Sequence, residues 1–341
     1  MARPPKRVAV LGGGMWGAVL SQQLAGAKAQ VRLWEFMPVL AESLERTRRH
    51  SNIAGFRLDD SVRVTSDIAR ACDGADVLLF VLPSQALAST ARAIRSRCRL
   101  NASTLAVNAS KGVEPKTLAT MGDIIERELP GLRGKVWTLT GPSFAREVAR
   151  GVPTSLLLGG PGGERAGALV SLFEGGALRV AHTPDRVGVE LGGSLKNAIA
   201  IGAGILDGLG AGANTKAALL VKGLAEMGRL ICARGGRPET IYGLAGLGDL
   251  IATGTSAESR NRAFGEKLGR GLTPARALAQ IPTVVEGLEA AARARELCRR
   301  FAVSAPLLDA VWRATRGASA QAVPRALGFR PARGGGYGQR R

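Results

Sequence analysis

A glycine-rich turn near the start of the chain limits the fold more than any other stretch. The apolar run Arg7–Leu11 is followed at once by Gly12–Gly17, which reads Gly-Gly-Gly-Met-Trp-Gly, and then by a helical pattern. In a Gly-x-Gly-x-x-Gly motif between a strand and a helix, Gly12 permits a tight turn, Gly14 lets a pyrophosphate approach the backbone, and Gly17 lets the helix pack closely on the strand. The unpaired N–H groups at the helix start attract the anion. The motif therefore predicts a dinucleotide-binding site.

The end of the next strand bears on which dinucleotide binds. Gln30–Trp34 is a second apolar strand, and Glu35 follows it eighteen positions after Gly17. A carboxylate at this place accepts hydrogen bonds from the adenosine ribose and repels a 2′-phosphate. The next residue is Phe36, where a basic residue would hold that phosphate. The cofactor is therefore expected to be NAD or NADP, with NAD favoured.

Strand and helix patterns alternate through the first half of the chain. Apolar runs such as Ala75–Leu82 and Ser103–Val107 are bounded by turns and separated by helical segments. This alternation predicts a Rossmann-type, doubly wound and mostly parallel sheet. Near residue 183 the strand patterns stop, and helices joined by glycine-rich turns follow. We expect an α/β dinucleotide-binding domain over 1–183, an all-α substrate domain over 184–328 and a disordered basic tail over 329–341.

Polar segments follow two of the strands. Asn108–Gly112 comes after one of them, and Thr140–Ala145 comes after another. Ligands of doubly wound sheets bind beyond the carboxyl ends of the strands, so Lys111 and Ser143 are candidates to contact a ligand. Lys111 also fits a surface lysine, and Ser143 also fits the cap of a helix over 144–150.

A lysine interrupts the most apolar stretch of the second half. Lys196 lies inside Val187–Leu209, which predicts one long buried helix. An ammonium in such a helix needs a partner or a function. The alternative is a lysine whose stem lines the core while its head reaches water.

Two later segments place charged groups among small and polar residues. Gly243–Leu250 puts Asp249 behind three spaced glycines, and Ser259–Arg262 reads Ser-Arg-Asn-Arg. An arginine fork beside serine and asparagine suits phosphate oxygens. The alternative is an exposed helix start that Ser259 caps.

With these motifs the chain resembles the NAD(P)-dependent glycerol-3-phosphate dehydrogenase family. The resemblance runs from Val8 to about Gly287 and fades beyond it. The motifs that carry it, in the order of the family, are Gly12–Gly17, Ser110–Gly112, Gly141–Glu147, Val189–Asn197, Gly246–Leu250, Ser259–Arg262 and Val284–Gly287.

The resemblance implies reversible hydride transfer from NAD(P)H to dihydroxyacetone phosphate, giving sn-glycerol 3-phosphate for glycerophospholipid synthesis. It implies that Lys196 is the proton donor and acceptor, with Lys111 and Asp249 as the other catalytic residues. The residues implied for the substrate site are Lys111, Gly141, Ser143, Lys196, Asn197, Asp249, Thr253, Ser259, Arg260 and Asn261. Those implied for the cofactor site are Gly12, Gly14, Met15, Trp16, Gly17, Glu35, Phe36, Lys111, Ala145, Arg260, Val284 and Glu286.

Other activities remain open from the sequence alone. A dehydrogenase for a 3-hydroxyacid or a 6-phosphogluconate-like substrate would also pair a dinucleotide domain with a helical domain and a lysine. A non-catalytic redox sensor that binds dinucleotide is a further alternative. Lys111 and Arg260 together favour a phosphorylated substrate.

Composition limits the other partners. The chain has 47 Lys and Arg against 27 Asp and Glu, a net charge of +20 that attracts anions. Because the basic residues are spread along the chain and only 4% of residues are aromatic, we expect a small acidic substrate and no nucleic acid. Four scattered cysteines indicate no metal site and a reducing compartment. Since no apolar run is long enough to span a membrane, we expect no stable membrane insertion and a cytoplasmic protein. The resemblance implies a homodimer.

Overall fold

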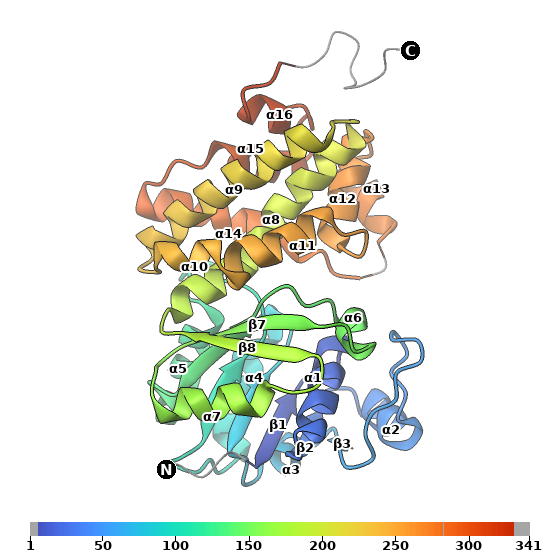
Figure 1. The fold of residues 1–341 in the computed structure, drawn as a ribbon, viewed down its shortest axis with the longest axis vertical. Helices are drawn as coiled ribbons and strands as arrows, with labels where there is room; N and C mark the ends of the chain where they lie inside the picture. Colours follow the sequence, from blue (N-terminus) through green and yellow to red (C-terminus); the bar gives the residue numbers. More distant parts are fainter. Residues whose placement is uncertain (1–5, 282, 331–341) are drawn as a thin grey trace. The chain divides into compact units, whose positions relative to one another are not determined.

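The structure is a computed structural model that describes residues 6–281 and 283–330 (Figure 1). The described chain forms two compact units. The first holds the residues up to Lys111 together with Ala119–Glu190, and the second holds Gly112–Leu118 together with the residues from Leu191 onward. The predicted boundary near residue 183 stays a prediction. Apart from Phe329 and Arg330, the predicted basic tail 329–341 lies outside the described residues.

The first unit is built on a sheet of eight strands within the described part of the chain. In the order β3-β2-β1-β4-β5-β6-β7-β8, every neighbouring pair is parallel except β6 with β7. This confirms the predicted doubly wound, mostly parallel sheet. The strands are β1 (Arg7–Leu11), β2 (Gln30–Trp34), β3 (Arg63–Thr65), β4 (Val77–Phe80), β5 (Leu105–Asn108), β6 (Val136–Thr140), β7 (Thr154–Gly159) and β8 (Leu178–Thr183).

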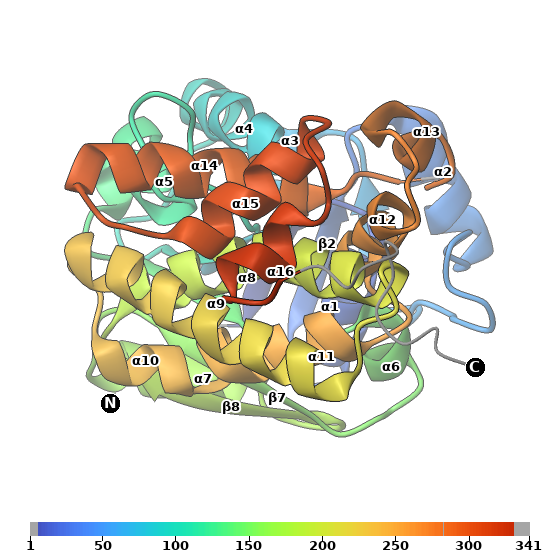
Figure 2. The ribbon, with the colours of Figure 1, turned by 90° about the horizontal axis from the view of Figure 1, so that it is seen from above.

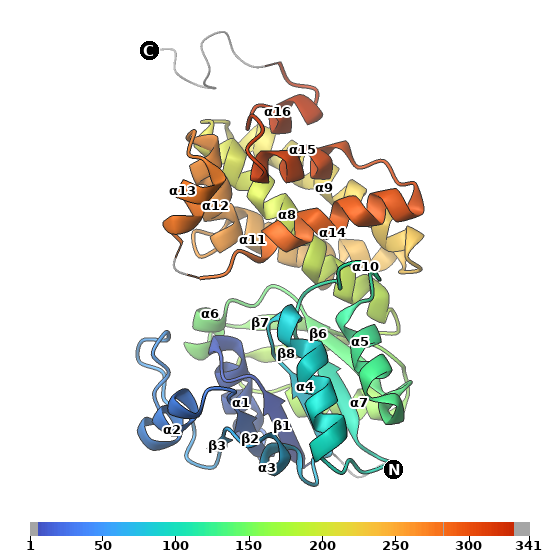
Figure 3. The same cartoon turned by 180° about the vertical axis from the view of Figure 1, so that it is seen from behind.

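Helices cover both faces of this sheet. One face is covered by α1 (Met15–Gly26), α2 (Pro38–Thr47), α6 (Ala145–Ala149) and α7 (Glu164–Phe173) (Figure 1). The other is covered by α3 (Ile68–Cys72), α4 (Ser84–Arg97) and α5 (Met121–Glu128), with a 3₁₀ turn at Pro130–Leu132 (Figure 3).

Strand β1 shows why the inner strands of the sheet are mostly apolar. Val8 and Val10 belong to one buried cluster, and Ala9 and Leu11 belong to the cluster on the opposite face. Successive side chains of a strand point to opposite faces, so a strand covered on both sides needs apolar residues at every position.

The second unit is helical, which confirms the predicted all-α second half. Helix α8 (Arg186–Gly208) begins in the first unit and continues into the second. The other helices are α9 (Ala213–Ala233), α10 (Pro238–Tyr242), α11 (Asp249–Thr255), α12 (Arg260–Gly269), α13 (Pro274–Ala279), α14 (Glu286–Phe301), α15 (Pro306–Thr315) and α16 (Ala322–Ala326), with a π-helical turn at Leu244–Gly248. Among the helices described, none combines the length and the apolar character that a membrane crossing requires.

Helix α8 is the central helix of the second unit, with α9, α12, α14 and α15 around it (Figure 2). A Cβ added at Gly204 would lie 1.9 Å from the carbonyl oxygen of Arg262, and one added at Gly265 would lie 2.0 Å from that of Ile201. Because glycine has no side chain at these two positions, α8 and α12 pack backbone to backbone. The long helix predicted over Val187–Leu209 is present and deeply buried.

Candidate active site

The glycine turn after β1 has the close approaches that its sequence predicts. Gly12 has a φ of +120°, and a Cβ there would lie 2.3 Å from the carbonyl oxygen of Val81. A Cβ at Gly17 would lie 1.9 Å from the Gly12 oxygen, whereas a Cβ at Gly14 would meet nothing within 4 Å. Helix α1 begins with no side-chain cap and no acidic residue in its first turn. Its first N–H groups are thus open to an anion, and the turn fits the pyrophosphate of a dinucleotide.

Glu35 joins the end of β2 to this turn. Its Oε2 accepts a hydrogen bond from the Gly13 N–H at 3.1 Å, and its Oε1 accepts one from the Met37 N–H at 3.0 Å. The carboxylate is therefore held beside the glycine turn. Phe36, 75% exposed, lies edge-on to Trp34 with 6.1 Å between the ring centroids.

Three further predicted cofactor residues lie at the starts of two helices on one face of the sheet. Met15 and Trp16 form the first turn of α1, and Ala145 begins α6. All three are partly buried against the apolar cluster on that face of the sheet.

The polar segments after β5 and β6 lie at the carboxyl ends of their strands. The Ser110 hydroxyl accepts a hydrogen bond from the Leu82 N–H at 2.8 Å, which ties the segment before Lys111 to the end of β4. The Ser143 hydroxyl donates to the Gly141 carbonyl oxygen at 3.0 Å. Ser143 does not cap α6, because the residue at the cap position is Phe144 and no side chain bonds there.

Lys196 is a buried charge on α8, in the part of that helix that belongs to the second unit. The residue is 4% exposed, and its Nζ lies 2.6 Å from Asp249 Oδ1 and 2.5 Å from Thr253 Oγ1. Asp249 and Thr253 are four residues apart on α11 and so share one face of that helix. The head of Lys196 is therefore held by a carboxylate and a hydroxyl inside the unit, and the alternative of a lysine that reaches water does not hold.

The glycine-rich stretch before Asp249 brings α11 close to α8. A Cβ at Gly192 would lie 2.7 Å from the Ala245 carbonyl oxygen, and one at Gly246 would lie 1.9 Å from the Ile241 oxygen. A larger residue at Gly192 would push the π-helical turn away from α8, and one at Gly246 would push it away from α10. The glycines thus allow the short distance between Lys196 and Asp249.

A second polar cluster links three helices of the same unit. Asn261 Nδ2 donates to Asn197 Oδ1 at 2.9 Å, and Asn261 Oδ1 accepts from the Gly287 N–H at 2.8 Å. Asn197 Nδ2 donates to Glu286 Oε2 at 3.2 Å. Both ends of the Asn261 amide are therefore engaged within the protein, and Asn197 is fixed in one orientation.

The start of α12 combines a buried cap with an exposed cation. Ser259 caps the helix by accepting a hydrogen bond from the Arg262 N–H at 3.2 Å. Arg260 is exposed and forms no ion pair with any residue of 6–281 or 283–330. Val284, which comes two residues before α14, is also exposed. The structure confirms that Ser259 caps α12, and Arg260 is left available for an anion.

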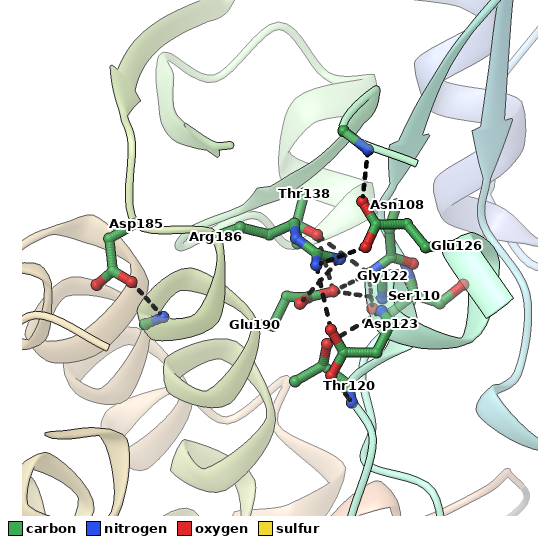
Figure 4. A network of polar contacts seen from close by, with 12 residues as sticks. Asn108, Ser110, Thr120, Gly122, Asp123, Glu126, Thr138, Asp185, Arg186 and Glu190 are labelled. Carbon is green, nitrogen blue, oxygen red and sulfur yellow. Dashed lines mark hydrogen bonds and ion pairs between the residues drawn. The ribbon is translucent and has the colours of Figure 1, made fainter. Parts of the chain in front are cut away.

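Sequence reasoning missed one buried charge cluster, which Figure 4 shows. Glu190 and Arg186 on α8 lie among Asn108, Thr138 and the first turn of α5. Burial raises the pKa of Glu190, although the Arg186 guanidinium opposes the shift. The sequence signal that could have found this cluster is the one that singled out Lys196, since Glu190 is an isolated charge within the same apolar stretch.

Comparison with known proteins assigns the family. The sequence model described as NAD-dependent glycerol-3-phosphate dehydrogenase N-terminus matches residues 7–163, and the one described as the C-terminus of the same family matches residues 185–323. Together they cover both units.

Individual relatives agree with the family models. A glycerol-3-phosphate dehydrogenase [NAD(P)+] of Nitratidesulfovibrio vulgaris is 41% identical over 307 residues, which are 90% of this chain and 92% of the relative. The enzyme of the same name from Geobacter sulfurreducens is 41% identical over 309 residues, with the same two coverages. The crystal structure of glycerol-3-phosphate dehydrogenase from Coxiella burnetii matches with a TM-score of 0.89 at 32% identity, over 96% of this chain and 100% of that chain. The chain belongs to the NAD-dependent glycerol-3-phosphate dehydrogenase family.

Proposed function

We propose that this chain catalyses reversible hydride transfer between NAD(P)H and dihydroxyacetone phosphate, giving sn-glycerol 3-phosphate. The observation that carries the proposal is the buried group of Lys196, Asp249 and Thr253. A lysine held by one carboxylate and one hydroxyl keeps a defined N–H direction, as a proton donor requires. The family supplies the substrate class.

The residues of this group divide the chemistry between them. A nicotinamide dinucleotide, when bound, supplies or accepts the hydride. Lys196 gives a proton to the substrate oxygen in reduction and takes one from the hydroxyl in oxidation. Asp249 balances the charge of the ammonium, and Thr253 fixes its orientation.

The phosphate of the substrate is assigned to Arg260. This guanidinium is exposed at the first position of α12, where the N-terminal N–H groups add to its attraction for an anion. Asn261 is carried from the family as a second ligand of the phosphate, and its amide also holds Asn197. Binding the inert phosphate positions the reacting carbon. The other substrate positions carried from the family are Lys111, Gly141, Ser143, Asn197 and Ser259.

The cofactor is assigned to the turn Gly12–Gly17, with Glu35 directed toward the adenosine ribose and NAD as the preferred form. The further cofactor positions carried from the family are Met15, Trp16, Phe36, Lys111, Ala145, Arg260, Val284 and Glu286. We also propose a cytoplasmic homodimer that supplies glycerophospholipid synthesis.

The test is turnover of Lys196→Met with NADH and dihydroxyacetone phosphate, followed by nicotinamide absorbance. Loss of a general acid typically lowers the rate by about 10²–10⁴-fold, while NADH affinity should stay within about twofold of wild type. Lys267→Met is the matched control and should leave the rate unchanged, because Lys267 lies on a different helix, α12, where it binds Gln280. A Lys196→Met variant that keeps more than about a tenth of the wild-type rate would remove Lys196 from the mechanism.

Two substrate controls separate the alternatives. Dihydroxyacetone without phosphate should react poorly, since Arg260 then has no anion to bind. Oxidation of a 3-hydroxyacid or of 6-phosphogluconate faster than of glycerol 3-phosphate would contradict the proposed substrate.

A further inference from the structure

The carboxylate of Glu190 is buried at the carboxyl ends of β5 and β6 (Figure 4). Its side chain is 2% exposed. Glu190 Oε1 accepts hydrogen bonds from the Gly122 N–H at 2.7 Å, the Thr138 hydroxyl at 3.0 Å and Asn108 Nδ2 at 3.4 Å. One oxygen therefore joins α8 to β5, to β6 and to the start of α5.

Asn108 passes this constraint to the segment that leads to Lys111. Its Nδ2 donates to the Ser110 carbonyl oxygen at 3.0 Å, and its Oδ1 accepts from the Ser110 N–H at 3.0 Å. The amide thus holds both backbone groups of Ser110. Since Lys111 is the next residue, the orientation of the Asn108 side chain sets the direction in which the chain enters Lys111.

The surroundings of Glu190 are built for a carboxylate. A Cβ at Gly122 would lie 2.9 Å from Glu190 Oε1 and 1.8 Å from a guanidinium nitrogen of Arg186, so a larger residue there would displace both charged groups. Arg186 lies 3.8 Å from Glu190 Oε2, and it also pairs with Asp123 at 3.1 Å and Glu126 at 3.2 Å. One guanidinium is thus shared by three carboxylates, of which Glu190 is the most buried.

Burial of this carboxylate carries a cost that a purely packing role would not require. Desolvation is the largest cause of the raised pKa of Glu190, ahead of the opposing effect of Arg186. An apolar residue of similar volume would fill the space and avoid that desolvation. An apolar residue would, however, remove the acceptor of the Gly122 N–H and one of the acceptors of the Asn108 amide.

We infer that Glu190 is a positioning residue whose carboxylate, through Asn108, fixes the turn at Ala109 and Ser110 and so the presentation of Lys111 to the substrate. The inference rests on the proposed function, in which Lys111 contacts the substrate. It assigns Glu190 no contact with substrate or cofactor.

A double-mutant cycle between Glu190 and Lys111 tests the inference. Glu190→Met should raise the KM for dihydroxyacetone phosphate about tenfold or more, and Glu190→Gln, which keeps the acceptor oxygen, should restore it to within about threefold of wild type. If Glu190 acts through Lys111, adding Glu190→Met to Lys111→Met should change KM and kcat no further than Lys111→Met alone. Additive effects of the two changes would overturn the inference.

Glu126→Gln is the matched control, because Glu126 pairs with Arg186, whereas the bonds of Asn108 Nδ2 go to Ser110, Thr138 and Glu190. It should leave KM unchanged, and a KM change equal to that of Glu190→Met would overturn the inference. Should Glu190→Met not fold, Glu190→Asp withdraws the carboxylate by one methylene and carries the same expectation. A wild-type KM for Glu190→Asp would likewise refute it.

Amide hydrogen exchange separates failure of this inference from failure of the proposed function. The Ser110 N–H should exchange faster in Glu190→Met than in wild type and in Glu126→Gln, whatever substrate the enzyme uses. Wild-type protein that is inactive on dihydroxyacetone phosphate would refute the proposed function alone. Unchanged exchange at Ser110 would refute the role of Glu190.

Discussion

The buried pair of Lys196 and Asp249 predicts a stability defect that a second mutation reverses. The two side chains are 5% and 3% exposed, and their charged atoms lie 2.6 Å apart. Removing one partner of such a pair leaves an uncompensated buried charge, which costs about 3–5 kcal/mol. Because Thr253 still accepts one hydrogen bond from the ammonium, we expect Asp249→Asn to cost about 3 kcal/mol, near the lower end of that range.

The double variant Lys196→Met with Asp249→Asn removes both charges together. Replacing a buried pair by neutral groups of similar volume is close to neutral, so the double variant should recover most of the lost stability. For a unit of this size about 3 kcal/mol corresponds to a fall of roughly 6–12 °C in the unfolding midpoint. Activity should not recover with stability, because both single variants and the double variant lack part of the proton-transfer group and should all be inactive.

Thermal unfolding of the four proteins, followed by circular dichroism, measures the coupling. Asp60→Asn is the control, because Asp60 pairs with Arg57 at a similar 2.9 Å but the two side chains are 74% and 65% exposed. It should shift the midpoint by less than about 2 °C, since exposed pairs contribute little. If the midpoint shifts of Lys196→Met and Asp249→Asn simply add in the double variant, the two groups do not form a buried ion pair and the reasoning is refuted.

Variants at three further positions probe other parts of the chain. Glu226 accepts hydrogen bonds from the first N–H groups of α15 at 3.0 and 2.9 Å, so Glu226→Ala should lower stability by about 2 kcal/mol, a fall of roughly 4–8 °C in the midpoint. Burial raises the pKa of Glu226 above its ordinary 4.5, so above pH 4.5 this group binds more protons in the folded chain than in the unfolded chain. The unfolding midpoint of wild type, measured relative to that of Glu226→Gln, should therefore fall as pH rises above 4.5. A relative midpoint that rises with pH contradicts this. Gly17→Ala places a Cβ 1.9 Å from the Gly12 oxygen and should lower stability by about 1–3 kcal/mol together with NADH affinity, so an unchanged NADH Kd speaks against the tight turn. Glu35→Ala should raise the kcat/KM with NADPH relative to NADH by roughly tenfold, measured by initial rates, and an unchanged ratio removes Glu35 from cofactor selection.

Local sequence patterns were enough to predict the fold and the buried helix that contains Lys196. The turn Gly12–Gly17 sits between a strand and a helix, and at Gly12 and Gly17 backbone atoms leave no room for a Cβ. The apolar stretch Val187–Leu209 predicted a buried helix, because burial of a helix on all sides requires apolar residues on all sides. Both features depend on neighbours within a few residues, which the sequence displays directly.

The partners of two polar residues became known only from the tertiary contacts. Ser143 bonds to the Gly141 carbonyl oxygen and not to the start of α6, since that oxygen lies within reach of its hydroxyl. The amide of Asn261, which the family resemblance places at the substrate phosphate, also bonds Asn197 and the Gly287 N–H. In both cases the sequence shows a polar residue, and only the tertiary structure shows which groups of the protein it bonds.

The sequence by itself determined which positions are buried, which backbone turns need glycine, and that a charge sits in an apolar helix. Only the tertiary structure decided which groups meet that charge, because Asp249 is 53 residues from Lys196 and comes to it through the packing of α11 on α8. The same holds for Glu190, whose contact with Asn108 spans 82 residues. Burial and backbone conformation are properties of a single segment. The partner of a buried charge depends on how distant segments pack against each other, and no local sequence pattern encodes that packing.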